Sequence, residues 1–250
     1  MTPDQIERAA NALVAARKGA AIASLPADAI PQSEADSYQI QDAVRAKLGE
    51  QVGGWKVGIS PVGGHFAAPI YASTVVASPA SLPARGFKLI GIECEIGFRF
   101  NKALPPRPAP YTQEEVLDAA SLHPTIEVVD SRYQDFRSLD RLLVLADNFS
   151  NGGLVWGAAV PNWEALDLVR TEMRVTEDGK PLADSAMGVA RDPVAALVDF
   201  ANLTRTRGGA KAGMFVTTGS WTGMVFTRHG TKITADFGPL GRVDIAFAEA

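Results

Sequence analysis

The sequence predicts an α+β fold in which a mixed, mostly antiparallel β-roll follows an N-terminal helical segment. Apolar residues recur at helical spacing over the first 52 residues, whereas Gly and Pro divide the rest of the chain into short runs of alternating polarity. Only two later segments have helical spacing, so the regular alternation of strands and helices of a doubly wound fold is absent. We expect one structural unit, with a helical segment over residues 1–52 and a β-roll domain over residues 53–250.

Two helices are predicted in the N-terminal segment. The first covers residues 4–18, where one face carries five apolar residues: Ile6, Ala9, Ala10, Leu13 and Val14. The second begins after Ser33, which precedes Glu34 as a helix-capping residue would. Its apolar face consists of Ile40, Ala43, Val44 and Leu48. Pro26 and Pro31 mark the connection between the two helices.

The remainder of the chain predicts nine short strands and two helices. The strands are expected at residues 54–59, 87–100, 124–130, 152–160, 170–176, 213–218, 223–227, 231–236 and 241–247. The helices are expected near residues 112–121 and 192–206.

Composition excludes several classes of protein. A net charge of −4 argues against a nucleic-acid or anionic-membrane partner. Cys94 is the only cysteine, which rules out an intrachain disulfide and fits a reducing cytoplasm. No apolar run approaches the length of a membrane span, and no phosphate-binding glycine motif is present. We therefore expect a cytoplasmic protein with a small-molecule ligand.

Three glutamates predict a metal site. Residues 91–100 alternate like a half-buried strand, which places Glu93 and Glu95 on one face and Cys94 on the opposite, core-facing side. Glu127 lies in a second strand-like run, from which it can join the pair. Neighbouring carboxylates repel one another, and an all-oxygen set suits Mg²⁺ or Mn²⁺ better than Zn²⁺. The alternative is that the two glutamates form the solvent-facing side of an edge strand.

A lysine and two polar segments add candidate substrate contacts. In the strand over residues 54–59, Lys56 faces away from the apolar side chains and has small glycines nearby. A cation beside an open surface suits a carboxylate or enolate ligand. The segments at residues 147–153 and 217–223 offer hydroxyl groups and backbone amides, and include Ser150 and Thr218. The alternatives are a solvent-exposed lysine and two ordinary hairpin turns.

Together these motifs resemble the 2-keto-4-pentenoate hydratase and 4-oxalocrotonate decarboxylase group of the fumarylacetoacetate hydrolase superfamily. The resemblance covers nearly the whole chain, through segments that begin at Ser33, Gly54, Ile92, Glu127, Ala146, Val216 and Phe237. It implies a fold like the C-terminal domain of fumarylacetoacetase. It also implies a homo-oligomer, with association with a partner enzyme of the same pathway as a further expectation.

The resemblance also assigns roles to residues. Mg²⁺ or Mn²⁺ would be held by the three glutamates Glu93, Glu95 and Glu127. Lys56 would face a 2-keto acid substrate, and Thr218 would contact its carboxylate. Ser150, from the polar segment at residues 147–153, is a further substrate-binding candidate.

One segment departs from the family pattern. Hydratases of the group have an aspartate between the lysine and the glutamate pair, whereas residues 61–73 contain no acidic residue. His65 is the candidate replacement as general base, and the alternative is a loop histidine without a catalytic task. We expect a mobile loop from Pro61 to Pro69, because this stretch has two glycines and no clear strand pattern.

The resemblance implies a metal-dependent lyase of aromatic catabolism. Hydration of a 2-hydroxypenta-2,4-dienoate-type acid ranks first. Decarboxylation of a 4-oxalocrotonate-like acid ranks second, and all three candidate reactions would use the same metal site as an electron sink. Hydrolysis of an acylpyruvate ranks third, because it needs a base to activate water and His65 has no glutamate close in sequence. A weakly active homologue that serves as a binding or assembly subunit is the alternative from another class.

Overall fold

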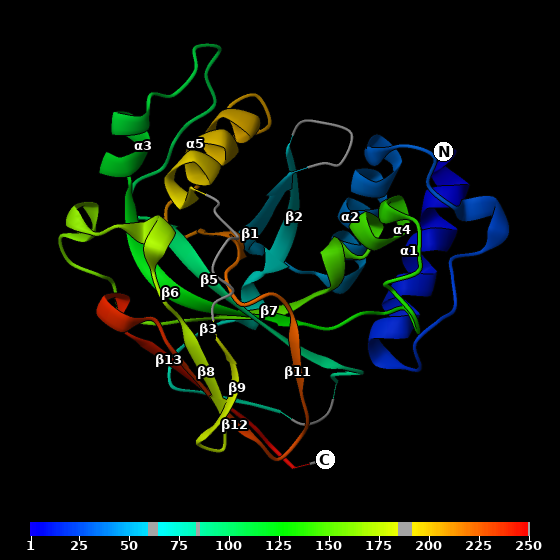
Figure 1. Ribbon diagram of the computed structural model, residues 1–250. Helices are drawn as coiled ribbons and strands as arrows, with labels where there is room; N and C mark the ends of the chain where they lie inside the picture. The colour runs from blue at the N-terminus through cyan, green and yellow to red at the C-terminus, as the bar shows by residue number, and fades with distance from the viewer. Residues whose placement is uncertain (60–64, 84–85, 185–191, 250) are drawn as a thin grey trace.

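Two mixed β-sheets with helices at two sides make up the fold, which confirms the predicted α+β class (Figure 1). The computed structural model describes residues 1–59, 65–83, 86–184 and 192–249. Within these ranges, no helix is long and apolar enough to cross a membrane.

The larger sheet carries the candidate site. Its strands follow the order β2-β1-β10-β5-β6-β7-β3, and β11 pairs with β5 beyond the end of β10. Most neighbours are antiparallel, and β1 with β10 and β3 with β7 are parallel. The strands are β1 (Val52–Ile59), β2 (His65–Tyr71), β3 (Val75–Ala77), β5 (Ile90–Phe100), β6 (Ala120–Val129), β7 (Asn151–Trp156), β10 (Phe215–Ser220) and β11 (Val225–Thr227).

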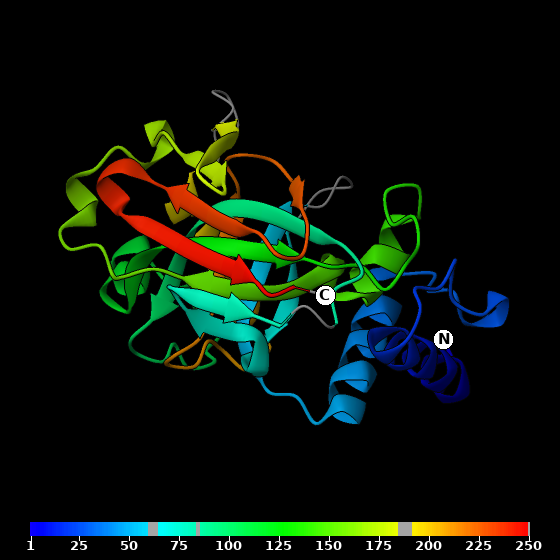
Figure 2. The ribbon, with the colours of Figure 1, turned by 90° about the horizontal axis from the view of Figure 1, so that it is seen from below.

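A smaller sheet lies across the larger one, as Figure 2 shows. Its strands are β4 (Ala80–Leu82), β13 (Arg242–Phe247), β12 (Lys232–Asp236), β8 (Arg174–Glu177) and β9 (Lys180–Asp184), in spatial order. Side chains of both sheets share one core, in which Ile96 of β5 and Val243 of β13 are fully buried. The core-facing residues of β5 therefore lie in the core that the two sheets share.

Helices flank the larger sheet at two places (Figure 1). One group consists of α1 (Pro3–Lys18), α2 (Glu34–Leu48) and the short α4 (Arg141–Ala146), which share a second apolar cluster. The other consists of α3 (Gln113–Asp118) and α5 (Pro193–Thr204). Ser33 caps α2 as predicted, because its hydroxyl accepts a hydrogen bond from the Asp36 amide. The predicted division into a helical segment over residues 1–52 and a β-roll domain over residues 53–250 stays a prediction.

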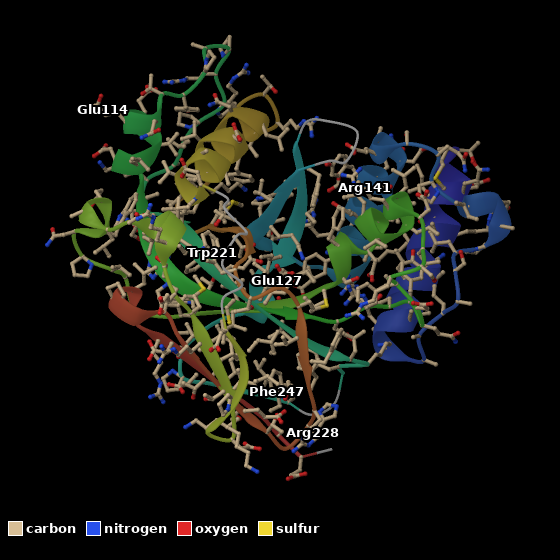
Figure 3. All side chains as sticks on the ribbon, viewed as in Figure 1. Glu114, Glu127, Arg141, Trp221, Arg228 and Phe247 are labelled. Carbon is tan, nitrogen blue, oxygen red and sulfur yellow. The ribbon has the colours of Figure 1, made fainter. Side chains whose placement is uncertain are left out.

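The alternation predicted for residues 91–100 is confirmed. Five side chains on one face of β5 are fully buried: Ile92, Cys94, Ile96, Phe98 and Phe100. Burial raises the pKa of the Cys94 thiol to about 12, as befits a core residue. β5 lies between β10 and β6, so the edge-strand alternative for Glu93 and Glu95 is wrong. Figure 3 places Glu127 near the middle of the molecule, far from the peripheral Glu114 and Arg228.

The prediction of a loop from Pro61 to Pro69 is wrong for its second half. β2 begins at His65 and pairs with β1, with Ala67 opposite Val57. Small residues at 67 and 68 hid the strand pattern, because alanine carries little signal of strand or polarity. Residues 60–64 and the side chain of His65 lie outside the described residues, so the roles of the loop tip and of this histidine stay predictions. The short elements β3, β4, β9 and α4 were also not predicted.

A buried ion pair fastens β6 to the helical side of the protein. Arg132 donates from Nε to Asp147 Oδ1 at 2.6 Å, and its backbone amide donates to Oδ2 at 3.0 Å. Neither side chain is more than 2% exposed. Arg132→Leu should lower the free energy of unfolding by about 3 kcal/mol, because it removes the guanidinium that is hydrogen-bonded to the buried Asp147 and leaves the carboxylate with the more distant Arg17, at 3.6 Å. Urea denaturation of Arg8→Leu provides the control, since the exposed pair of Arg8 and Asp28 should change it by less than about 1 kcal/mol. Equal stabilities of the two variants would contradict a structural role for Arg132.

Candidate metal and substrate site

The structure brings the three predicted glutamates together. In the antiparallel register of β5 and β6, Glu93 lies directly opposite Glu127, and Glu95 follows on the same face of β5. One carboxylate oxygen of each residue lies within 4.8 Å of those of the other two. Like charges on directly opposite residues of paired strands are destabilising, so this arrangement favours the binding of a cation.

Hydrogen bonds orient two of these carboxylates. Glu127 is fully buried, and its Oε1 accepts from Lys56 Nζ at 2.6 Å and from Asn151 Nδ2 at 3.0 Å. Its Oε2 is buried and has no hydrogen-bond partner within the described part of the chain. Glu95 Oε2 accepts from the Gly219 amide at 2.6 Å. The unpartnered oxygen of Glu127 is the kind of acceptor that a divalent metal ion would satisfy.

Burial makes it costly for Glu93, Glu95 and Glu127 to be negatively charged at the same time. It raises the pKa of Glu95 to about 8, and the charges of Glu127 and Glu93 add to the rise. Burial also raises the pKa of Glu93, against the attraction of Lys56. A divalent ion bound among the three carboxylates would remove this cost by favouring their ionised forms.

Lys56 projects from β1 toward the same group. Its Nζ lies 4.0 Å from Glu93 Oε2 and donates to the Phe149 carbonyl at 3.2 Å. Burial alone would lower the pKa of Lys56, but the charges of Glu127 and Glu93 raise it above its ordinary value. The ammonium group is therefore held in its charged form. The solvent-exposed alternative is wrong, since the side chain is only 14% exposed.

The nearby glycines do not leave the open surface that the sequence suggested. A Cβ at Gly54 would lie 2.9 Å from the Phe215 carbonyl oxygen, and one at Gly58 would overlap the ring of Phe66. These glycines allow close packing on both sides of β1.

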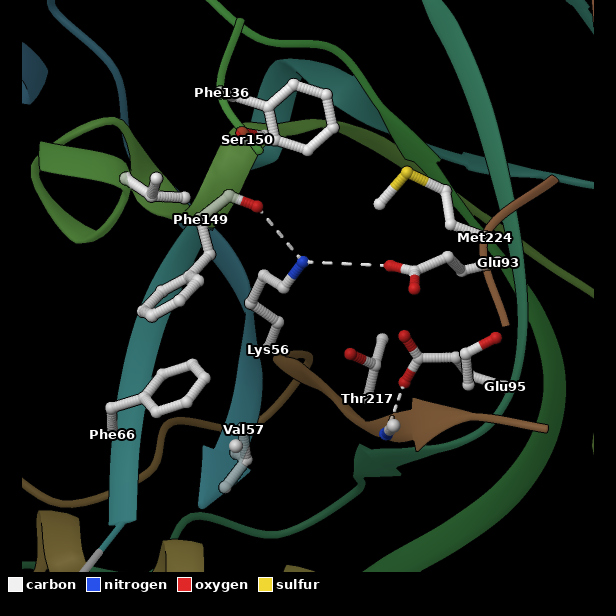
Figure 4. Close-up of a pocket in the computed structure, with 14 residues that line it drawn as sticks. Lys56, Val57, Phe66, Glu93, Glu95, Phe136, Phe149, Ser150, Thr217 and Met224 are labelled. Atoms are coloured by element: carbon white, nitrogen blue, oxygen red, sulfur yellow. Dashed lines mark hydrogen bonds and ion pairs between the residues drawn. The ribbon is translucent and has the colours of Figure 1, made fainter. Parts of the chain in front are cut away.

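A cavity of about 290 Å³ opens beside Lys56 and the glutamates (Figure 4). Its lining residues are Lys56, Val57, Gly58, Phe66, Glu93, Glu95, Phe136, Val144, Phe149, Ser150, Thr217, Gly219, Ser220 and Met224. A volume near 300 Å³ suits a small organic acid.

The predicted hydroxyl groups lie in different surroundings. Ser150 lines the cavity, and its buried Oγ has no hydrogen-bond partner among the described residues. Thr218 is fully buried and donates from Oγ1 to the Ile96 carbonyl at 2.8 Å, outside the cavity lining. Its neighbour Thr217 lines the cavity with a buried, unpartnered hydroxyl. The substrate contact of Thr218 stays a prediction, and the geometry adds Thr217 as a candidate.

Sequence reasoning missed several residues of the site. Asn151, which contacts Glu127, and Phe149, which contacts Lys56, both lie in the polar run 147–153 that was singled out. The sequence therefore pointed to this segment, but it did not show which of its atoms contact Glu127 and Lys56. Phe66 gave no signal, because its strand was not predicted.

A rolled, mixed sheet that carries three converging carboxylates and a buried lysine could hold a divalent cation beside a cavity of the size of a small organic acid. A scan against protein-family models found no match. The chain is nevertheless 32% identical to a 4-oxalocrotonate decarboxylase of Pseudomonas putida over 229 residues, which is 85% of each chain. A second such enzyme, from Pseudomonas sp. (strain CF600), has the same identity and coverage. The chain belongs to the 2-keto-4-pentenoate hydratase and 4-oxalocrotonate decarboxylase family, as its motifs predicted.

Solved structures agree on the fold. The structure of a 4-oxalocrotonate decarboxylase from Pseudomonas putida G7, complexed with magnesium and adipate, superposes with a TM-score of 0.82. The two share 24% sequence identity, over 99% of this chain and 98% of the other. A fumarylpyruvate hydrolase from Pseudomonas aeruginosa, in complex with Mn²⁺ and pyruvate, gives a TM-score of 0.56 at 14% identity over 78% of this chain and 89% of the other. The predicted superfamily fold is thereby confirmed.

Proposed function

We propose that this chain is a divalent-metal-dependent decarboxylase of a 4-oxalocrotonate-like 2-keto acid. The observation that carries the proposal is the convergence of Glu93, Glu95 and Glu127 beside the buried Lys56, at a cavity of suitable size. The relatives that are 32% identical are decarboxylases by name. Hydration, which the sequence ranked first, becomes the alternative.

The described lining of the cavity supplies what decarboxylation needs. Hydration needs a base or a metal-bound water to activate the nucleophile, whereas loss of CO₂ needs an electron sink and a proton donor. Apart from the candidate metal ligands, no carboxylate lines the described part of the cavity. Lys56 supplies the proton donor.

Each residue of the site has a role in this proposal. Glu93, Glu95 and Glu127 would hold Mg²⁺ or Mn²⁺, which when bound supplies Lewis-acid stabilisation of negative charge on the C2 oxygen of the substrate. Lys56 adds positive charge beside that oxygen and holds a proton at Nζ for it. The unpartnered hydroxyls of Thr217 and Ser150 donate to the C1 carboxylate.

One assay separates the candidate reactions. Purified protein with Mg²⁺ would be supplied with 4-oxalocrotonate, 2-hydroxypenta-2,4-dienoate or acetylpyruvate. We expect CO₂ release from the first compound as the fastest reaction. Faster hydration of the dienoate or hydrolysis of acetylpyruvate would overturn the decarboxylase proposal. Mg²⁺ binding without turnover of any compound would support a binding or assembly subunit.

Asn151 offers a test of the metal site that does not depend on activity. Its amide donates to Glu127 Oε1 and, with Lys56, leaves Oε2 free for the metal. Asn151→Ala should weaken Mn²⁺ binding by about 10-fold to 100-fold in calorimetric titration, since partners of metal ligands commonly contribute this much. Exposed Asn101 provides the matched control, and Asn101→Ala should leave the Kd unchanged. Equal Kd values for both variants would contradict the ligand assignment of Glu127.

The homo-oligomer, the partner enzyme and the cytoplasmic location stay predictions.

A further inference from the structure

The cavity has a charged side and an apolar side (Figure 4). Lys56, Glu93 and Glu95 form the charged side. The rings of Phe66 and Phe149 stack with their centroids 4.0 Å apart and an interplanar angle of 18°, and together we call them the aromatic wall. Phe136, Val144 and Met224 add further apolar lining.

Unusual backbone conformation positions this wall. Three consecutive residues that are not glycine have positive φ angles: Asn148 at 53°, Phe149 at 49° and Ser150 at 57°. Such conformations cost on the order of 1–3 kcal/mol each and persist mostly at functional sites. The turn brings the Phe149 ring to the wall and its carbonyl oxygen to Lys56 Nζ at 3.2 Å. We take the strain as a sign that the position of Phe149 matters for function.

The other half of the wall depends on a glycine. A Cβ at Gly58 would lie 1.9 Å from Cζ of Phe66, so only glycine lets the ring lie over β1. Two separate backbone features, the left-handed turn and Gly58, therefore serve the same aromatic surface.

On its cavity side, the wall presents no cation to a second carboxylate. Lys56 is the only cation among the described lining residues. Arg141 lies beside the stack, with Cζ at 5.1 Å from the Phe66 centroid and 5.6 Å from that of Phe149. It donates from Nη1 to Glu34 Oε1 at 2.6 Å, and its buried Nη2 has no hydrogen-bond partner among the described residues, but Arg141 does not line the cavity.

We infer that the aromatic wall receives the carboxylate that leaves as CO₂, and that it promotes the reaction by withholding water and cations from that group. This inference rests on the proposed decarboxylase function. The C–C bond to the distal carboxylate breaks, and its electron pair moves through the conjugated chain to the C2 oxygen. CO₂ leaves as a neutral molecule, and the C2 oxygen takes up a proton. Negative charge thus moves from the wall to the charged side, so the wall destabilises the bound substrate more than the transition state.

Binding of two unreactive compounds tests the inference on the unchanged protein. 2-Oxohexanoate and 2-oxohexanedioate have the same chain length, and only the second has a distal carboxylate. With Mg²⁺ present, we expect 2-oxohexanoate to bind at least about tenfold more tightly in calorimetric titration, because the dianion must bury an unpaired charge. Tighter binding of 2-oxohexanedioate would overturn the inference. If that tighter binding were then lost in Arg141→Met, the arginine would be shown to receive the distal carboxylate.

Two variants of Phe66 test the kinetic consequence. Phe66→Lys places a cation at the wall, so KM for 4-oxalocrotonate should fall while kcat falls by about tenfold or more. The apolar control Phe66→Leu should keep kcat within about threefold of the unchanged protein. An unchanged kcat in a folded Phe66→Lys variant would overturn the inference. If Phe66→Lys does not fold, the two-compound comparison decides alone. Absence of CO₂ release by the unchanged protein would instead refute the proposed function itself.

Discussion

Glu95→Gln should abolish turnover and remove the stabilisation by Mg²⁺, yet it should raise the melting temperature of the metal-free protein. Glu95 is 2% exposed, and its carboxylate lies close to those of Glu93 and Glu127. Glutamine has the same shape without the charge, so it lessens the repulsion that burial makes costly. A gain of 1 kcal/mol corresponds to about 2–4 °C in a chain of this size, which scanning calorimetry resolves.

Exposed Glu114 of α3 provides the control for this substitution (Figure 3). Glu114→Gln should leave turnover, Mg²⁺ stabilisation and the metal-free melting temperature unchanged. If Glu95→Gln kept full activity at limiting Mg²⁺, or if it lowered the metal-free melting temperature, Glu95 would not be a metal ligand held among like charges.

The glutamate site could be predicted because strand periodicity is strict. A residue and its second neighbour on a strand share one face, so the positions of Glu93 and Glu95 follow from the sequence. The sequence did not contain the register of β5 and β6, which sets Glu127 directly opposite Glu93. Register depends on the packing of whole strands, and a shift by one residue would have turned Glu127 to the other face.

The hydroxyl contacts could not be predicted by the same rule. The pairing of β10 with β5 shifts between Thr217 and Ser220, and Gly219 has a φ of 104°. An irregularity of this kind changes which face each residue presents, so simple alternation fails there. The left-handed turn at Phe149 was equally hidden, because local sequence preferences favour right-handed or extended backbone for phenylalanine.

Lys56→Met should reduce kcat/KM by about 10²–10³-fold, because it removes a preorganised positive charge from the oxygen at which negative charge develops. It should also destabilise the metal-free protein by about 3–5 kcal/mol, since Glu127 is fully buried and loses the ammonium that it accepts from at 2.6 Å. Exposed Lys102, which pairs with exposed Asp118, provides the control, and Lys102→Met should change neither quantity measurably.

A second substitution separates the two effects of Lys56→Met. Adding Glu127→Gln to Lys56→Met removes the unpaired buried charge, so urea denaturation should show most of the lost stability restored in the metal-free protein. Activity should stay lost, because both the lysine charge and a metal ligand are then missing. The metal-free stability thus falls on loss of the lysine and rises on loss of a glutamate, as expected for a cation among excess buried carboxylates. Full activity in Lys56→Met would show that Lys56 does not serve the substrate. No recovery of stability in the double variant would show that Lys56 does not offset the charge of Glu127.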